Sequence, residues 1–173
     1  MTTPNNGLFG APTKNGGVDG YVNVGIPFER TVEDSSGVKY KQRCIYLYST
    51  AAVDLGDAVG FDRADTTYGF GHSVKPSPAV LASTFEYVGA ALSTLTAAGL
   101  LLVALSGYAQ VNTENEASAA AGGRFIVDVG NAGEYALQST AAAADVMAGI
   151  FLAAETAGTP DLTPALLKDQ GWF

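Results

Sequence analysis

The chain has 173 residues, of which 47% are hydrophobic, only 15% are charged and 21 are glycine. This length suits one domain with a flexible extension, and the apolar content excludes a disordered chain, which would be rich in charge and poor in apolar residues. The formal net charge is −8 and the nine basic residues are scattered, whereas nucleic-acid binding requires clustered Lys and Arg. We therefore predict that nucleic acid is not the main ligand.

Residues 1–42 carry frequent glycine and proline and no sustained apolar period. Such a segment cannot bury enough surface alone to offset the entropy lost on ordering. We predict an extended, irregular N-terminal arm that lies either on a partner or on its own domain. The polar start MTTPNNGLFGAPTKNGG also lacks the basic and then apolar pattern of a secretory signal.

From Arg43 the pattern becomes that of strands. RCIYLYST combines alternation with aromatic and β-branched residues, which predicts a strand packed on both faces with the lone Cys44 in the core. Just before it, KYKQR places Lys39, Lys41 and Arg43 on one face, either as a solvated edge that discourages aggregation or as a contact for an acidic partner. VDLGDAVGFD then predicts a turn and a strand, residues 63–80 a loop, and FEYVGAAL a further strand.

The apolar stretch GLLLVAL raises the question of a membrane span, because no charge lies between Glu86 and Glu114. A spanning helix needs about 20 predominantly apolar residues. The continuous apolar run here covers only residues 100–105, and Gly99 before it and Ser106-Gly107 after it are turn or bulge signals. We therefore predict a buried strand and no membrane association.

The C-terminal third continues this pattern. RFIVDV and EYALQS flank GNAG, which predicts a hairpin. Residues 141–145 are expected to form a short helical or irregular turn before a strand at 147–155, and TPALLKDQ is either one helical turn capped at Thr163 or a closing strand. Strands at about ten-residue intervals with glycine turns predict a mainly β fold, a single β-sandwich or barrel domain over residues 43–173.

Catalytic and metal-binding signals are weak. Nucleophilic catalysis needs a base beside the nucleophile, and the single His72 lies in a Gly/Ser/Pro-rich loop where neither Ser73 nor Cys44 forms a local signature. One cysteine excludes an internal disulfide and a multi-cysteine zinc site. The loop acids present hard-cation ligands, but acids are common in turns because Asp bonds its own backbone; they are Asp54, Asp57, Asp62, Asp65, Glu114 and Glu116.

A glycosidase would need paired acids in a cleft lined with aromatic side chains. The aromatic residues instead occupy predicted core positions: Tyr46, Tyr48, Phe61, Phe85 and Phe151. No glycine-rich element follows a strand and opens a helix, so a nucleotide cradle has no support. We expect a protein without catalysis, cofactor or bound metal.

The chain resembles the small virion proteins of tailed bacteriophages, and in particular head decoration, or cement, proteins. The resemblance covers residues 43–173 and is carried by YSTAAVDLGDAVGF, AAGLLLVALSGYAQVNTE, AAGGRFIVDVGNAGEYAL, VMAGIFLAAETAG and the terminal GWF. It implies an enzymatically inert β protein, made in the host cytoplasm, that stabilises the outer capsid surface. The implied partners are the major capsid protein and other copies of this chain, either in a homo-oligomer or as neighbours on the capsid, with no nucleic acid and no membrane.

Such proteins often clamp neighbouring capsid subunits with extended segments, so the arm fits this role. Its apolar side chains are the expected partner-binding anchors: Leu8, Phe9, Tyr21, Val22, Val24 and Ile26. Two alternatives stay open. One is a phage tail, neck or fibre structural subunit, and the other is a carbohydrate-binding β-sandwich module that uses exposed Tyr and Trp172.

Overall fold

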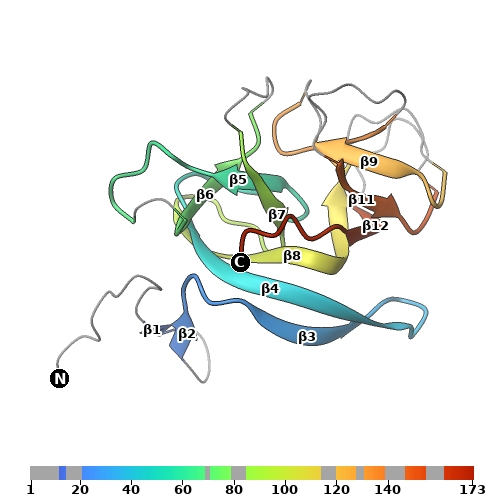
Figure 1. Ribbon diagram of the computed structural model, residues 1–173, viewed down its shortest axis with the longest axis horizontal. Helices are drawn as coiled ribbons and strands as arrows, with labels where there is room; N and C mark the ends of the chain where they lie inside the picture. The colour runs from blue at the N-terminus through green and yellow to red at the C-terminus, as the bar shows by residue number, and fades with distance from the viewer. Residues whose placement is uncertain are drawn as a thin grey trace.

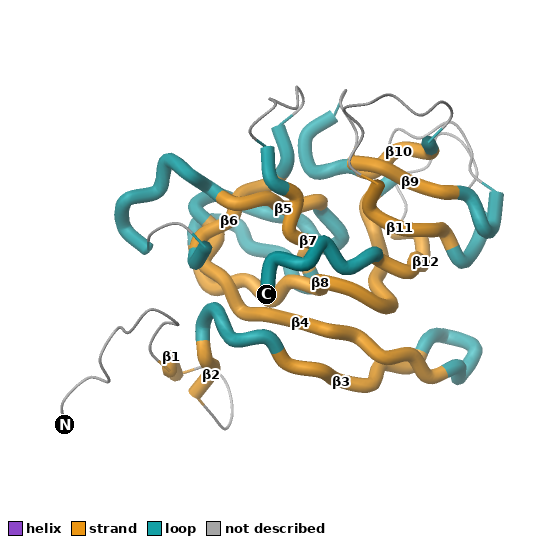
Figure 2. The backbone as a smooth tube through the Cα atoms, viewed as in Figure 1, coloured by secondary structure: helices purple, strands orange, loops and turns teal. Residues whose placement is uncertain are grey.

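The computed structural model describes residues 12–14, 21–68, 71–78, 85–113, 120–127, 131–138, 147–154 and 162–173, with backbone alone for 12–14 and 21–23. Across these residues the chain forms strands and no helix, which confirms the mainly β prediction (Figures 1 and 2). The strands are β1 (Pro12–Lys14), β2 (Tyr21–Asn23), β3 (Phe28–Glu33), β4 (Lys39–Ser49), β5 (Ala58–Phe61), β6 (Ser73–Pro76), β7 (Tyr87–Ala91), β8 (Gly99–Asn112), β9 (Arg124–Val127), β10 (Tyr135–Leu137), β11 (Met147–Phe151) and β12 (Leu162–Leu167).

A small closed barrel forms one half of the domain. Strand β4 pairs with β8, β8 with β7, β7 with β5 and β5 with β6, all antiparallel, and β6 returns to β4 in a parallel pairing that closes the ring. Closing a sheet on itself removes exposed edges and encloses a core. The buried interior side chains include Ile45, Leu47, Val59, Val74, Leu101 and Val103.

Strand β8 runs from the barrel into the other half of the domain. Its first part pairs with β4 and β7, and its last residues, from Gly107 to Asn112, pair with β12. Strands β11, β9 and β10 then extend the sheet outward from β12, as the right-hand part of Figure 1 shows. A second core lies against this extension, where the rings of Phe125, Tyr135 and Phe151 are buried together.

The stretch GLLLVAL is therefore a strand, as predicted, with Leu101, Val103 and Leu105 buried. No helix among the described residues is long and apolar enough to cross a membrane. The hairpin predicted around GNAG is confirmed by the antiparallel pairing of β9 with β10. The C-terminal alternative resolves as the closing strand, because β12 pairs with both β8 and β11. The turn expected at 141–145 lies outside the described residues.

The sheet begins earlier than the sequence pattern indicates. Strand β3 pairs with β4 from Phe28↔Cys44 to Glu33↔Lys39, although it belongs to the segment 1–42 that was expected to be irregular. The alternation of apolar and polar residues in β3 is weak. An edge strand exposes many of its side chains and therefore needs few apolar residues. Strand β6 lies in a segment that was predicted to be a loop. It was not predicted because it is short and contains Pro76, a residue that is typical of loops.

Glycine permits the close packing of β7 on β8. A Cβ atom at Gly89 would overlap the backbone carbonyl oxygen of Ala104, whereas one at Gly99, at the start of β8, would find its nearest atom 3.8 Å away. Both glycines lie in strands, but only Gly89 faces an immovable backbone. The pair therefore separates the effect of crowding from the general effect of adding a methyl group.

We predict that Gly89→Ala lowers the free energy of unfolding by roughly 1–3 kcal/mol or more, because the strands must separate to admit the methyl group. Gly99→Ala is the matched control and should change it by less than about 1 kcal/mol. Urea denaturation of the three proteins measures the difference. Equal midpoints for Gly89→Ala and wild type would contradict the packing described above.

Candidate functional site

The loop acids that sequence analysis singled out hold turns together. The Asp57 carboxylate accepts hydrogen bonds from Asp54 N (2.9 Å) and from Asn112 Nδ2 (3.0 Å). Asp62 accepts from Thr50 Oγ1 (2.7 Å) and Lys75 Nζ (3.1 Å). Burial raises the pKa of Asp62, but hydrogen bonds from Thr50 and Lys75 outweigh it and keep that pKa below its ordinary value. The described residues contain no cluster of metal-binding side chains, and Glu114 and Glu116 lie outside them.

The candidate nucleophiles have structural surroundings. Cys44 is buried, as predicted, and burial raises the pKa of its thiol, which disfavours the reactive thiolate. Ser73 is also buried, and its hydroxyl donates to Asp62 O (3.4 Å). At His72 the backbone carbonyl accepts Tyr48 N (2.9 Å), which holds the loop against β4. Of the aromatic residues expected in the core, Phe61 and Phe151 are buried, while Tyr46, Tyr48 and Phe85 are half-buried.

Residues 168–173 lie against the barrel core. The Trp172 ring donates from Nε1 to Tyr87 O (2.7 Å) and meets Phe61 edge-on, and Phe173 packs on the barrel residues. Arg43 reaches both Asp169 Oδ2 (2.7 Å) and Phe173 O (2.5 Å). Arg43 is thereby used within its own chain, while Lys39 and Lys41 from the same predicted basic face are exposed.

Exposed apolar side chains lie at both ends of β3. Ile26 is 43% exposed, Phe28 is exposed and stacks on Tyr46, and Val38 is exposed in the turn after β3. Among the predicted anchors, Val24 is only 1% exposed and bridges to Tyr46, so its own domain covers it. Leu8 and Phe9 lie outside the described residues, and for Tyr21 and Val22 only the backbone of β2 is described.

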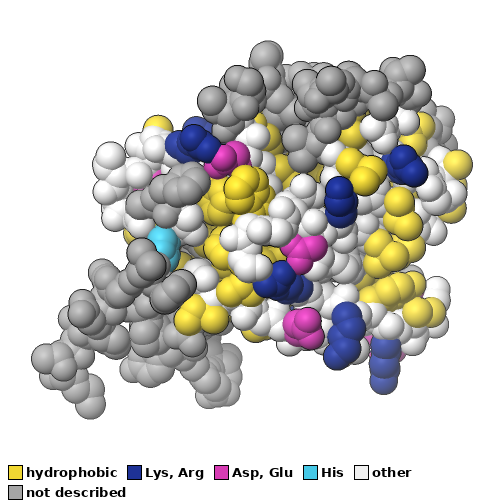
Figure 3. Space-filling model, in the orientation of Figure 1, with side chains coloured by type: hydrophobic (Ala, Val, Ile, Leu, Met, Phe, Trp, Pro, Cys, Tyr) yellow, Lys and Arg dark blue, Asp and Glu magenta, His cyan; other side chains and the backbone are white. Residues whose placement is uncertain are grey.

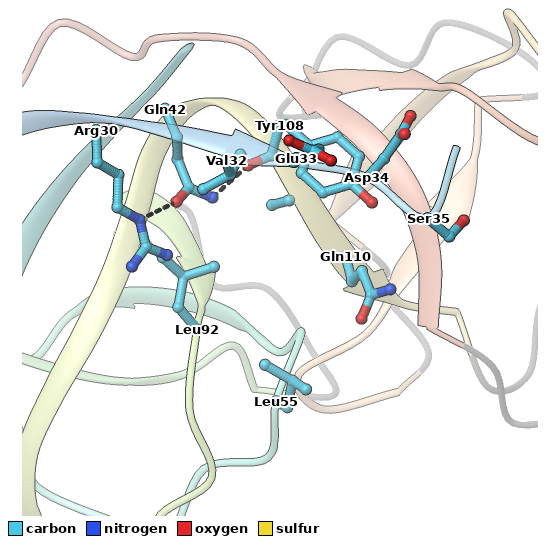
Figure 4. Close-up of a pocket in the computed structure, with 11 residues that line it drawn as sticks. Arg30, Val32, Glu33, Asp34, Ser35, Gln42, Leu55, Leu92, Tyr108 and Gln110 are labelled. Carbon is cyan, nitrogen blue, oxygen red and sulfur yellow. Dashed lines mark hydrogen bonds between the residues drawn. The ribbon is translucent and has the colours of Figure 1, made fainter. Parts of the chain in front are cut away.

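A groove crosses the face formed by β3, β4 and β8, with a volume of about 270 Å³. Its lining residues are Arg30, Val32, Glu33, Asp34, Ser35, Gln42, Leu55, Leu92, Tyr108, Ala109 and Gln110. We call it the Arg30 groove. Figure 4 shows the guanidinium end of Arg30 extending toward Leu92 on one side, with Glu33 and Asp34 at the opposite end. The groove therefore has a basic end, an acidic end and apolar residues in its lining.

Gln42 fixes the orientation of Arg30. The Gln42 side chain is 2% exposed; its Nε2 donates to Tyr108 O and its Oε1 accepts from Arg30 Nε (2.6 Å). Because the backbone carbonyl of Tyr108 can only accept, the amide has one satisfactory orientation. This pair could not be predicted from the sequence, since a lone Gln and a lone Arg twelve residues apart form no motif.

A second, open groove of about 290 Å³ lies over β9, β11 and β12. Its apolar side chains are Met147, Ile150, Leu166 and Leu167, and its cations are Arg124 and Lys168. Figure 3 shows basic side chains spread between separate apolar groups on one face of the molecule. This distribution resembles an interaction surface more than an enclosed reaction site.

Comparison of the sequence with known proteins assigns the chain to no family. No family model matches the chain, and no curated protein shows significant similarity to it.

The C-terminal segment offers a fluorescence test, because Trp172 is the only tryptophan. The pKa of Asp169 lies below its ordinary 3.8. The largest cause is the hydrogen bond from Gly171 N, and the contact with Arg43 adds to it, while burial acts in the opposite direction. A lowered folded-state pKa means that the contribution of Asp169 is complete above the ordinary value and is lost as pH falls through the lowered one. We predict that Trp172 emission stays constant from neutral pH down to 3.8 and shifts to the red below it.

Asp169→Asn should produce part of this red shift already at neutral pH. The matched control is Asp65→Asn, which removes another turn acid whose pKa is lowered by bonds to backbone N–H groups, here those of Thr67 and Tyr68. Its emission should match wild type. Identical emission from Asp169→Asn and wild type at neutral pH would show that Asp169 does not hold the segment.

Proposed function

We propose that this chain is a structural virion protein of a tailed bacteriophage, a decoration or cement protein that binds the outer capsid surface and stabilises it without catalysis. The observation that carries the proposal is the edge of β3. Among the described strands, β3 pairs only with β4. The apolar side chains of Ile26 and Phe28 at its start, and of Val38 after its end, are exposed. The resemblance of residues 43–173 to cement proteins points the same way.

An open strand edge is a strong docking element. Its unpaired backbone groups accept a strand from another chain, and neighbouring apolar side chains add burial energy. Proteins that stay monomeric usually protect such edges. A cement protein must instead add interface across subunit boundaries, so an edge with adjacent apolar residues suits the role.

The net charge supports an outward-facing position on the capsid. A net charge of −8 is unfavourable near packaged DNA, whose phosphates repel acidic surfaces. Under this proposal the partners are the major capsid protein and neighbouring copies, and the chain is made in the host cytoplasm before joining the virion.

The proposal is tested by gradient sedimentation of a lysate from the source culture, with quantitative mass spectrometry of the particle fraction. A decoration protein should be found there at an abundance comparable to that of the major shell protein. Recovery at a small fraction of that abundance would instead assign the chain to a tail, neck or fibre. Absence from particles would overturn a virion role.

We predict that Ile26→Asp weakens particle attachment more than about tenfold, because a buried isoleucine contributes roughly 1.5–3 kcal/mol. Leu162→Asp is the matched control, since Leu162 is 37% exposed on β12 and β8 and β4 lie between β12 and β3 in the sheet. Its attachment should equal that of wild type. Co-sedimentation with particles measures all three proteins, and full attachment of Ile26→Asp would rule out the β3 edge as the docking surface.

A further inference from the structure

We propose that the Arg30 groove binds an extended peptide segment that presents a carboxylate, an apolar side chain and a cation at alternate positions. That the segment belongs to a shell protein rests on the proposed function, whereas the chemistry of the groove does not.

Arg30 presents a prepared anion-binding edge. Its Nε is occupied by Gln42 Oε1 at 2.6 Å, so the donors on Nη1 and Nη2 form the remaining edge of the planar guanidinium. That edge matches the two oxygens of a carboxylate. The ion pairs within the described part of the chain belong to Arg43, Arg63 and Lys75, so no described carboxylate takes this position.

Burial of the polar Gln42 amide supports the interpretation that Gln42 positions Arg30. A buried amide stabilises a fold only when its polar atoms are bonded, and an apolar residue would fill the same site without that requirement. Here the amide joins Arg30 on β3 to the carbonyl of Tyr108 on β8. The result is a guanidinium held at a defined place on an otherwise acidic protein.

The opposite end of the groove favours a cation. Asp34 accepts hydrogen bonds from Ser36 N (2.8 Å) and Val38 N (2.9 Å), which fix its carboxylate in the turn after β3. Glu33 lies beside it in the groove. A simple anion would be attracted by Arg30 but repelled by this end, so the complementary ligand carries both charges.

The spacing defines the segment. Arg30 lies on β3 and Asp34 directly follows the last residue of that strand. An extended backbone over these four steps places their Cα atoms about 13 Å apart. An extended ligand spans the same distance between positions i and i+4, and its side chain at i+2 lies on the same face. That central side chain would meet Leu55, Leu92 and Val32 in the groove. A volume of about 270 Å³ holds a few side chains, not a cofactor.

The test titrates the isotope-labelled full chain with the blocked peptide acetyl-Glu-Ala-Leu-Ala-Lys-amide and follows it by NMR. We expect saturable shifts at Arg30, Gln42 and Tyr108. Replacing Glu by Gln in the peptide should weaken binding roughly tenfold to a hundredfold, as expected for loss of a charged hydrogen-bond pair. Absence of shifts at these residues, or equal binding of the Gln peptide, would overturn the proposal.

The protein variants test the same contact from the other side. Arg30→Lys keeps the charge but presents a single ammonium instead of a planar edge, so it should bind the Glu peptide about tenfold more weakly. Arg124→Gln, which removes an exposed arginine from the other groove, should bind like wild type. Wild-type affinity in Arg30→Lys would overturn the proposal. Particle sedimentation tests the proposed function separately, because peptide binding does not depend on it.

Discussion

The sharing of strand β8 between the barrel and the outer strands is the constraint on which the rest of the structure depends. One part of the strand closes the barrel with β4 and β7, and the other carries β12 and the outer strands. A strand shared in this way must let neighbouring backbones approach closely. Small residues make this possible: Ala104 of β8 faces Gly89 of β7, and Gly107, at φ +83°, lies against the backbone of Lys41. The high alanine and glycine content is thus explained by packing within the chain, at least around this strand.

The sequence pattern predicted the buried strands best. Apolar runs bounded by glycine, such as residues 100–105, carry a local signal that does not depend on knowing the partner strand. Strands β3 and β6 were not predicted. An edge strand such as β3 needs little alternation of apolar and polar residues, and β6 is short and contains Pro76, which is typical of loops. The local sequence could not distinguish a helical turn from a strand after Thr163. The segment is a strand because it pairs with the last residues of β8, which are distant in sequence.

The candidate site was less predictable than the fold. Arg30 and Gln42 become neighbours through the β3–β4 register, and Tyr108 joins them from a strand more than sixty residues away. No spacing rule finds such a set. Among the predicted anchors, Val24 and Ile26 are only two residues apart yet have opposite surroundings, one covered by its own domain and one open to solvent. Position in an apolar segment could not distinguish them, because the distinction arises from the bridge to Tyr46.

The barrel closes through a short parallel seam between β4 and β6, where Tyr48 pairs with Ser73 and Ser49 with Val74. The β7–β8 pairing is equally short but antiparallel, and parallel pairs are slightly less stable per residue. Local opening of the native barrel is therefore cheapest there, and amide protons along the seam should exchange with solvent sooner than those between β4 and β8. The barrel is therefore expected to open between β4 and β6 while the longer β4–β8 pairing stays intact.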